Sequence, residues 1–257
     1  MRGSLALHGA AAATLVVHPA AWPWALGAAV ADHLAITAAG LVPRSRWLGP
    51  NLTRLPDSAG AAVALTVDDG PDPEVTPQVL DLLAAAGVRA TFFCIGSRVR
   101  QHPALAREIV ARGHTVENHS EHHLHRFSLL GPRAMAAEVL RAQDSIGSVT
   151  GRVPRFFRAP AGLRNPFLTP ALARGGLQLV SWTRRGFDTL TADPGLILAR
   201  LTHQLGAGDI LLVHDGHAAR RGTSAPAVLS VLPQLLRTLA GRQLRTVTLD
   251  AALPEAP

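Results

Sequence analysis

The chain has 257 residues, of which 47% are hydrophobic and 17% are charged, so it can bury the core of one large domain and is not wholly disordered. Its formal net charge is +7, carried by arginine because the sequence contains no lysine. The arginines are scattered and only 4% of residues are aromatic, which argues against a nucleic-acid partner. A single cysteine excludes an internal disulfide framework and a zinc module built from several cysteines. Nothing in the sequence indicates a protein partner.

The first fifty residues form an apolar extension. Between Arg2 and Arg44 the only formally charged residue is Asp32. Because a membrane-spanning helix needs about 20 apolar residues, the segment predicts two short spans broken near Pro19–Pro23, or one span. Ala29-Val30-Ala31 also fits the cleavage pattern of a secretory signal. The alternative without a membrane is an alanine-rich helical extension packed on the domain.

This extension suggests a division into residues 1–50, a membrane anchor or signal-like segment with its linker, and residues 51–257, the main domain. It also predicts a membrane-associated or exported protein. Arg44 and Arg46 follow the second apolar run, so a two-span hairpin would keep both flanks in the cytoplasm if these arginines stay inside. With one arginine on the other flank, charge asymmetry alone does not fix the orientation.

After residue 60, short β-like apolar runs alternate with segments of helical period. Thr76-Pro77, His102-Pro103 and Pro132 open three helices, and glycines close the first two. Strands separated by helices of this length predict a parallel sheet. We therefore expect an α/β fold, a distorted or incomplete (β/α) barrel of about seven parallel strands. The predicted strands are Val63–Val67, Ala90–Cys94, His114–Glu117, Arg155–Phe157, Leu177–Trp182, Ile210–Val213 and Leu244–Thr248.

Ionisable residues follow five of these strands. Parallel α/β folds place their catalytic groups at the carboxyl ends of the strands, so we expect these side chains to meet at one rim. Taken singly, each has a plain structural explanation, such as an Asp-Gly turn, a solvated histidine-rich loop or a satisfied core histidine. The residues concerned are Asp68, Asp69, His119, Arg158, Asp188 and His214.

The two aspartates and the histidine-rich segment suggest a metal site. Neighbouring carboxylates repel unless a metal or an arginine compensates, and Asp68 and Asp69 are adjacent. His119 and His123 are spaced i,i+4, so one helical turn would bring both imidazoles to one metal. Ser120 stands where the zincin motif has glutamate.

His122 likewise occupies the position at which the inverzincin motif has glutamate, so a metalloprotease is disfavoured. His122 and His125 leave alternative ligand pairs open on spacing alone.

Together and in this order, the residues resemble the motifs of the polysaccharide deacetylase family, the NodB-homology domain of carbohydrate esterase family 4. The resemblance runs from Val63 to Leu249. The matching segments are Thr66-Val67-Asp68-Asp69-Gly70-Pro71, His119-Ser120-Glu121-His122-His123, Arg158-Ala159-Pro160-Ala161-Gly162 and Leu212-Val213-His214. One motif departs: the family usually has Asp-Trp after the fifth strand, whereas this chain has Asp188-Thr189.

The resemblance implies a role for each matching residue. Asp69, His119 and His123 would bind a divalent metal, usually zinc in this family. Asp68 would be the base that activates water, and Arg158 would orient it. The remaining implied roles are the acid His214, its tuning carboxylate Asp188, the backbone N–H of Ala161 at the oxyanion, and a substrate wall at Leu212. Thr189 stands where the family usually has tryptophan, and Phe187 or Trp182 would supply the substrate wall that this tryptophan provides.

The function implied is a metal-dependent hydrolase that removes N-acetyl groups from amino sugars of a polysaccharide or glycoconjugate. Amide hydrolysis needs an activated water, stabilisation of the carbonyl oxygen and a proton for the amine, which a metal, a carboxylate and an imidazole supply. The alternatives are a small-molecule amide or imide hydrolase on the same scaffold and an inactive glycan-binding relative. An envelope glycan favours the extracytoplasmic face; a cytoplasmic-facing anchored enzyme is the alternative.

Overall fold

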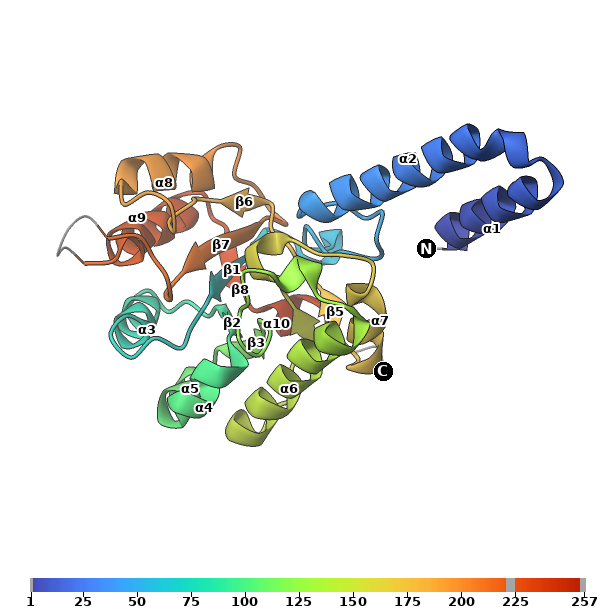
Figure 1. Cartoon of the computed structure of the whole chain (residues 1–257). Coiled ribbons are helices and arrows are strands. Elements are labelled where there is room, and N and C mark those ends of the chain that lie inside the picture. The colour runs from blue at the N-terminus through green and yellow to red at the C-terminus, as the bar shows by residue number, and fades with distance from the viewer. Residues whose placement is uncertain (1, 221–224, 255–257) are drawn as a thin grey trace.

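A parallel β-sheet forms the centre of the molecule in the computed structural model, which describes residues 2–220 and 225–254 (Figure 1). The described residues contain eight strands in the order β5-β4-β3-β2-β1-β7-β6, with β8 also paired to β1. All the strand pairs are parallel. The strands are β1 Ala62–Asp68, β2 Thr91–Cys94, β3 Thr115–Asn118, β4 Phe156–Phe157, β5 Gln178–Leu179, β6 Arg184–Arg185, β7 Ile210–His214 and β8 Arg245–Val247.

Strand β1 is the centre of the sheet. It pairs with β7 along its length, with β2 near its carboxyl end and with β8 near its start. Its side chains alternate between two buried layers, as the two-residue period of a strand requires. Val63, Leu65 and Val67 belong to the outer hydrophobic core, whereas Ala64 belongs to the core on the other face. The same alternation puts Thr66 and Asp68 on the inner face.

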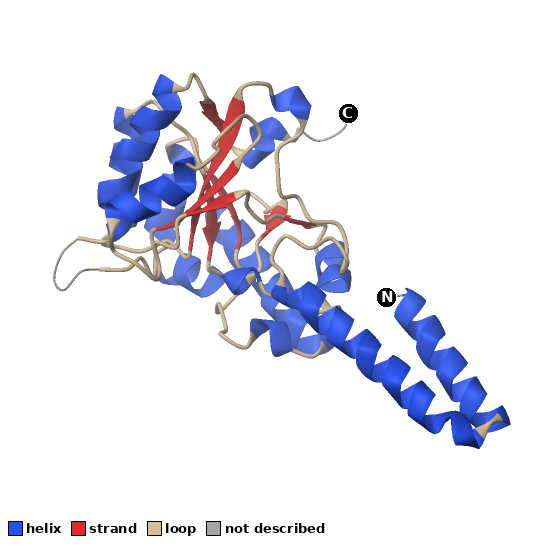
Figure 2. Ribbon diagram, turned by 90° about the horizontal axis from the view of Figure 1, so that it is seen from above, coloured by secondary structure: helices blue, strands red, loops and turns tan. Residues whose placement is uncertain are grey.

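Helices cover the outer face of the sheet (Figures 1 and 2). Apolar side chains of α3, α5, α8 and α9 pack on it in one hydrophobic core, while α6 and α7 pack in a second core beside β4 and β5. The helices of the body are α3 Thr76–Ala85, α4 Gly96–Gln101, α5 Pro103–Ala111, α6 Pro132–Thr150, α7 Leu168–Arg174, α8 Pro194–Thr202, α9 Ala227–Gly241 and α10 Leu249–Ala252. Short 3₁₀ turns lie at Asp57–Ala59, Phe127–Leu129 and Pro160–Gly162.

The predicted fold class is confirmed. The sheet curls into a half-barrel, and β5 and β6, the last strands of the order, are not paired with each other among the described residues. The seven predicted strands correspond to β1–β5, β7 and β8, and the three predicted helix starts open α3, α5 and α6. Strand β6 was not predicted, because it consists of two arginines and has no apolar alternation.

The amino-terminal extension is a helical hairpin that projects from the α/β body (Figures 1 and 2). Helix α1 spans Arg2–Val17, a 3₁₀ turn follows at Pro19–Ala21, and α2 spans Trp22–Leu41. The break at Pro19–Pro23 therefore lies where the proline pattern predicted it. Residues Pro19–Leu41 are long and apolar enough to cross a membrane, and few of them are buried.

The hairpin meets the body at the end of α2. Gly40 is buried there, and its carbonyl accepts a hydrogen bond from the backbone N–H of Arg164 at 3.1 Å. A side chain at Gly40 would collide with the Arg164 carbonyl, so the close approach requires glycine. The segment that follows continues the contact, since the carbonyl of Pro43 accepts hydrogen bonds from Ser181 Oγ at 2.7 Å and Asn51 Nδ2 at 3.0 Å.

Candidate active site

The residues singled out at the strand ends meet around one cleft of about 790 Å³ at the carboxyl edge of the sheet. Asp68 ends β1, His119 follows β3, Arg158 follows β4 and His214 ends β7. Asp188 comes three residues after β6, so an unpredicted strand brings it to the same rim. The cleft is lined by Asp68, Asp69, His119, His123, Ala161, Leu212 and His214, among others.

Asp69, His119 and His123 place their acceptor atoms at one point. Asp69 Oδ1 lies 3.1 Å from His119 Nε2 and 3.2 Å from His123 Nε2. His119 Nδ1 contacts the carbonyl of Arg158 at 2.8 Å. Because a carbonyl only accepts, Nδ1 carries the proton and Nε2 turns a lone pair toward the carboxylate. Two lone-pair atoms that face each other this closely repel unless a cation lies between them.

Burial and charge around these three residues fit a divalent cation. Asp69 Oδ1 is buried and has no hydrogen-bond partner. Burial, reinforced by the neighbouring His119, lowers the pKa of His123 to about 4, so this imidazole is neutral and able to ligate at pH 7. Two neutral imidazoles and a carboxylate are a zinc-type donor set.

A turn brings the two histidines together, where their spacing had suggested a helical turn. Residues 119–123 are not helical, and Ser120 and His123 have positive φ angles of 64° and 50°. The turn is held by side chains: Asn118 Oδ1 accepts from the N–H of Ser120 at 3.0 Å, and Ser120 Oγ accepts from the N–H of His123 at 3.1 Å. Asn118 is itself anchored to α6 through the carbonyl of Val139.

Asp68 lies beside this cluster in a buried ion pair. Arg158 Nη1 donates to Asp68 Oδ1 at 2.6 Å and to Thr66 Oγ1 at 2.7 Å. The guanidinium of Arg158 lies over the ring of Phe93, and Nη2 donates to the carbonyl of Ser181 at 3.0 Å. Burial lowers the pKa of Arg158, although Asp68 opposes this effect. With Oδ1 held by arginine, the other oxygen of Asp68 faces His119 Nε2, 3.8 Å away.

His214 lines the cleft and is held in place by Asp188. Asp188 Oδ1 contacts His214 Nδ1 at 2.8 Å, and Asp188 Oδ2 accepts the backbone N–H of His214 at the same distance. Burial lowers the pKa of His214, but the hydrogen bond and charge of Asp188 outweigh it, so the pKa is raised above its ordinary value. The arrangement suits a protonated imidazole with Nε2 free for a reactant.

The walls of the cleft come from strand β7 and from loops that follow other strands. Ala161 sits in the 3₁₀ turn after β4 with a φ of 53°, and Leu212 is a buried residue of β7. Of the two aromatic residues expected to replace the wall lost at Thr189, Trp182 lines the cleft. Phe187 instead lines an adjoining recess, and Thr189 itself is at the rim of the cleft.

Asp69, His119 and His123 are called the metal-type cluster below. Sequence reasoning missed two residues that contact this cluster at Asp69. His217 Nδ1 lies 3.1 Å from Asp69 Oδ2, and Arg98 donates to the Asp69 carbonyl at 2.9 Å and contacts His217 Nε2 at 3.1 Å. Since arginine only donates, His217 Nε2 accepts and Nδ1–H points at Asp69. His217 follows His214 by three residues and was detectable; nothing near Arg98 in the sequence connects it with Asp69.

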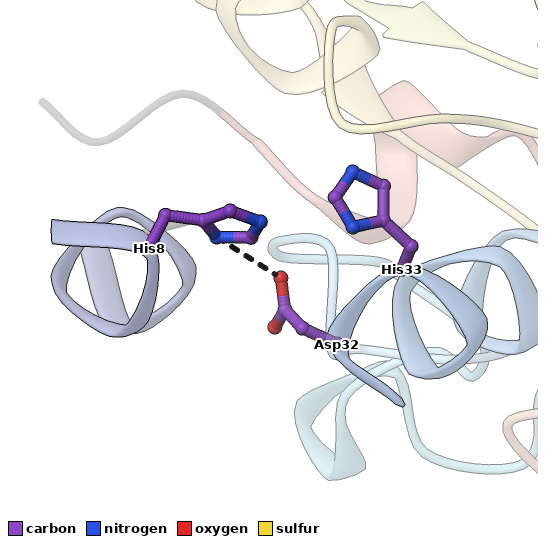
Figure 3. Close-up of side chains that lie close together, drawn as sticks. All are labelled: His8, Asp32 and His33. Atoms are coloured by element: carbon purple, nitrogen blue, oxygen red, sulfur yellow. Dashed lines mark ion pairs between the residues drawn. The ribbon is translucent and has the colours of Figure 1, made fainter. Parts of the chain in front are cut away.

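A second Asp/His group lies between α1 and α2, where His8, Asp32 and His33 approach one another (Figure 3). Nδ1 of His8 and of His33 bonds the carbonyl four residues earlier in its own helix, each at 2.8 Å. This group differs from the cleft in two ways: Asp32 Oδ2 accepts a hydrogen bond from Ser4 Oγ at 2.5 Å, and none of the three residues is buried. The Ser4–Asp32 bond joins the two helices.

Comparison with known proteins points the same way. The sequence model of the family described as polysaccharide deacetylase matches residues 56–180. A peptidoglycan-N-acetylglucosamine deacetylase of Bacillus cereus is 35% identical over 191 residues, which cover 74% of this chain and 85% of that protein. A chitooligosaccharide deacetylase of Bradyrhizobium sp. (strain ANU 289) is also 35% identical over 191 residues, covering 70% of this chain and 87% of that protein.

Solved structures resemble the fold as well. A family 4 carbohydrate esterase from Streptomyces lividans, in complex with acetate, superposes with a TM-score of 0.65 at 35% identity. The similarity covers 73% of this chain and 92% of that one. The matched part is therefore the α/β body.

Proposed function

The chain belongs to the polysaccharide deacetylase family, and on that premise we propose that it removes N-acetyl groups from amino sugars of an envelope glycan with a metal-assisted water. As a member, it is a hydrolase of N-acetyl amide bonds in polysaccharides. The observation that carries the mechanism is the unpaired, buried Asp69 Oδ1 facing two imidazole nitrogens.

We assign Asp69, His119 and His123 to a divalent cation, with zinc as the first choice because of the two imidazoles. Such a cation supplies Lewis acidity toward the attacking water and the amide carbonyl. The chain itself supplies the geometry: His119 is oriented by the Arg158 carbonyl, and Asp69 by the N–H of His217.

Asp68 takes the proton from the attacking water. Its Oδ1 is held by Arg158, which leaves Oδ2 turned to the metal-type cluster. His214 gives a proton to the departing nitrogen, because Asp188 favours the imidazolium and fixes its Nδ1–H. Base and acid thus hold opposite protonation states at the same pH. The N–H of Ala161 is assigned to the developing oxyanion, and Leu212 and Trp182 to the substrate wall.

Release of acetate tests this assignment. Chitooligosaccharides and peptidoglycan fragments are incubated with the full chain loaded with zinc, and acetate is measured. We expect turnover that falls by about 10³-fold or more in Asp68→Asn, since a positioned general base and its proton transfer are lost. The variant should keep its metal. Acetate release from simple amides or imides but not from glycans would favour the small-molecule alternative, and metal binding without turnover on any of them would favour the inactive one.

The hairpin is assigned to the membrane, with residues 1–50 as anchor and linker and residues 51–257 as the catalytic domain. A single span would expose Asp32 to lipid, which is costly. In the hairpin, Asp32 instead accepts a hydrogen bond from Ser4 on the neighbouring helix. Pairing the two helices therefore supports insertion as a hairpin, with the body on one side.

We place the body on the extracytoplasmic face, because the relative of Bacillus cereus is named for peptidoglycan, an envelope polymer. Protease added to intact spheroplasts should then cut the body while a cytoplasmic marker survives. Protection of the body until the membrane is broken would show the cytoplasmic-facing orientation. Recovery of the full chain in the soluble fraction would contradict the anchor.

A further inference from the structure

A second recess of about 540 Å³ adjoins the catalytic cleft. The two cavities share Trp182 and Arg185 in their walls, so a substrate in the cleft can extend into the recess. The recess is bounded by basic side chains from three elements: Arg44 after α2, Arg184 and Arg185 on β6, and Arg200 and His203 at the end of α8.

Most of this positive charge is uncompensated. Arg184 is neutralised by the buried carboxylate of Asp209, 3.0 Å from its Nε. Within the described part of the chain, Arg44, Arg185 and Arg200 have no carboxylate partner. Arg44 and Arg200 each donate to one backbone carbonyl at 3.4 Å. Arg185 Nε is buried and has no hydrogen-bond partner, although a buried donor left without one is costly.

Aromatic rings hold the guanidinium groups in place. Arg185 lies over the rings of Trp182 and Phe187, with 5.2 and 4.9 Å to the ring centroids, and Arg200 lies 5.4 Å from Phe187. Stacking fixes the plane of a guanidinium but uses none of its N–H groups. The donors of Arg185 therefore stay available to a ligand that reaches from the cleft.

We propose that Arg44, Arg185 and Arg200 form an anion-binding subsite for a phosphate or diphosphate carried by the N-acetylated sugar substrate. The combined positive charge of three arginines is larger than one carboxylate can neutralise. Their N–H groups match the several oxygens of a phosphate. The proposal rests on the deacetylase function proposed above and specifies its substrate class. Arg44 follows α2 by three residues, so the subsite lies where the membrane hairpin leaves the body (Figure 1).

The test compares two substrates that differ only in the anion. Chitotetraose and chitotetraose 1-phosphate are deacetylated by the full chain in detergent, as wild type, Arg185→Gln and Arg200→Gln. Arg107→Gln is the matched control, since Arg107 is exposed on α5 and outside both cavities. We expect each of the two subsite variants to raise KM for the phosphorylated substrate about tenfold relative to KM for chitotetraose, the effect of losing a charged hydrogen bond. The control should change neither.

Calorimetric titration with inorganic pyrophosphate tests the subsite without catalysis. Binding that weakens in Arg185→Gln but not in Arg107→Gln is expected, even if no deacetylation is detected, in which case the proposed function alone fails. Equal KM changes for both substrates would refute the subsite while the function stands.

Flotation with phosphatidylglycerol and phosphatidylcholine vesicles tests a lipid headgroup as the alternative source of the phosphate. If Arg185→Gln weakens only binding to phosphatidylglycerol vesicles, the arginine contacts a lipid headgroup, and the substrate subsite is overturned.

Discussion

Three acceptor atoms of Asp69, His119 and His123 point at one another, and this residue-scale feature favours the cleft over the hairpin as the proposed metal site. In the hairpin, Asp32 accepts a hydrogen bond from Ser4, and none of the three residues is buried. In the cleft, Asp69 Oδ1 has no hydrogen-bond partner. Two groups of the same composition therefore have different expected affinities for a cation.

Metal content measures this difference. We expect about one zinc per chain in the wild type, and His119→Ala should lower the affinity by at least about tenfold, because loss of one of three ligands opens the site. His8→Ala is the matched control and should keep the wild-type zinc content. Equal losses in both variants, measured by plasma emission after dialysis, would contradict the assignment.

The His214–Asp188 pair sets the expected pH dependence. In the proposed mechanism His214 acts as a protonated acid, so kcat/KM should fall as pH rises through its pKa. Asp188 raises that pKa; Asp188→Asn removes the charge, lowers the pKa and moves the basic limb of the profile to lower pH. Asp81→Asn on α3, whose carboxylate pairs with the surface residue Arg112, should leave the limb unchanged. If the basic limb of the kcat/KM profile does not shift in Asp188→Asn, Asp188 does not tune the pKa of His214.

At the scale of elements, helix α8 illustrates how local sequence secures part of the site. Asp193 Oδ1 accepts the N–H groups of Gly195 and Leu196 at 2.9 and 3.1 Å, so it caps the helix that carries Arg200. Ile197 and Leu201 of α8 are buried against the sheet. They also pack on Gly186, where an added side chain would collide with Ile197.

Removing the cap should destabilise the body modestly. We expect Asp193→Ala to lower the free energy of unfolding by about 1 kcal/mol, and Asp193→Asn to restore most of it, because asparagine caps as well as aspartate. Urea unfolding followed by circular dichroism measures both, and zinc content should not change. An alanine variant as stable as the wild type would show that the first turn of α8 is held by packing alone.

At the scale of the whole molecule, residues 40–51 tie the hairpin to the active site. The Pro43 carbonyl accepts from Ser181, whose own carbonyl accepts from Arg158, the partner of Asp68. A Cβ added to Gly162 would meet Pro43, so the same segment also packs on the loop that carries Ala161. The contacts of the body therefore begin before residue 51.

Two fragments test this boundary. A chain that begins at residue 38 keeps these contacts and should bind zinc and turn over substrate like the full chain. A chain that begins at residue 51 loses the Pro43 hydrogen bonds, and its stability should fall by about 1–3 kcal/mol. Thermal unfolding and acetate release compare the two. Equal stability and equal turnover would mean that residues 38–50 only link the hairpin to the body.

The sequence by itself determined the fold class and most of the residues that gather at the cleft. Five of the seven predicted strands are followed by an ionisable residue, and parallel βα units bring such ends to one rim whatever the details of packing. Residues at strand ends can be identified from the sequence alone, because each lies next to its strand in the chain. The residues identified in this way are Asp68, Asp69, His119, Arg158 and His214.

Only the tertiary structure decided which groups touch. Strand β6, the Arg98–His217 contact with Asp69, the recess at Arg185 and the contacts of Pro43 join residues that are far apart in the chain. The turn that brings His119 and His123 together depends in the same way on Asn118 being anchored to α6. Such contacts follow from how helices and loops pack, and neither a hydrophobic period nor a short motif encodes packing between distant segments.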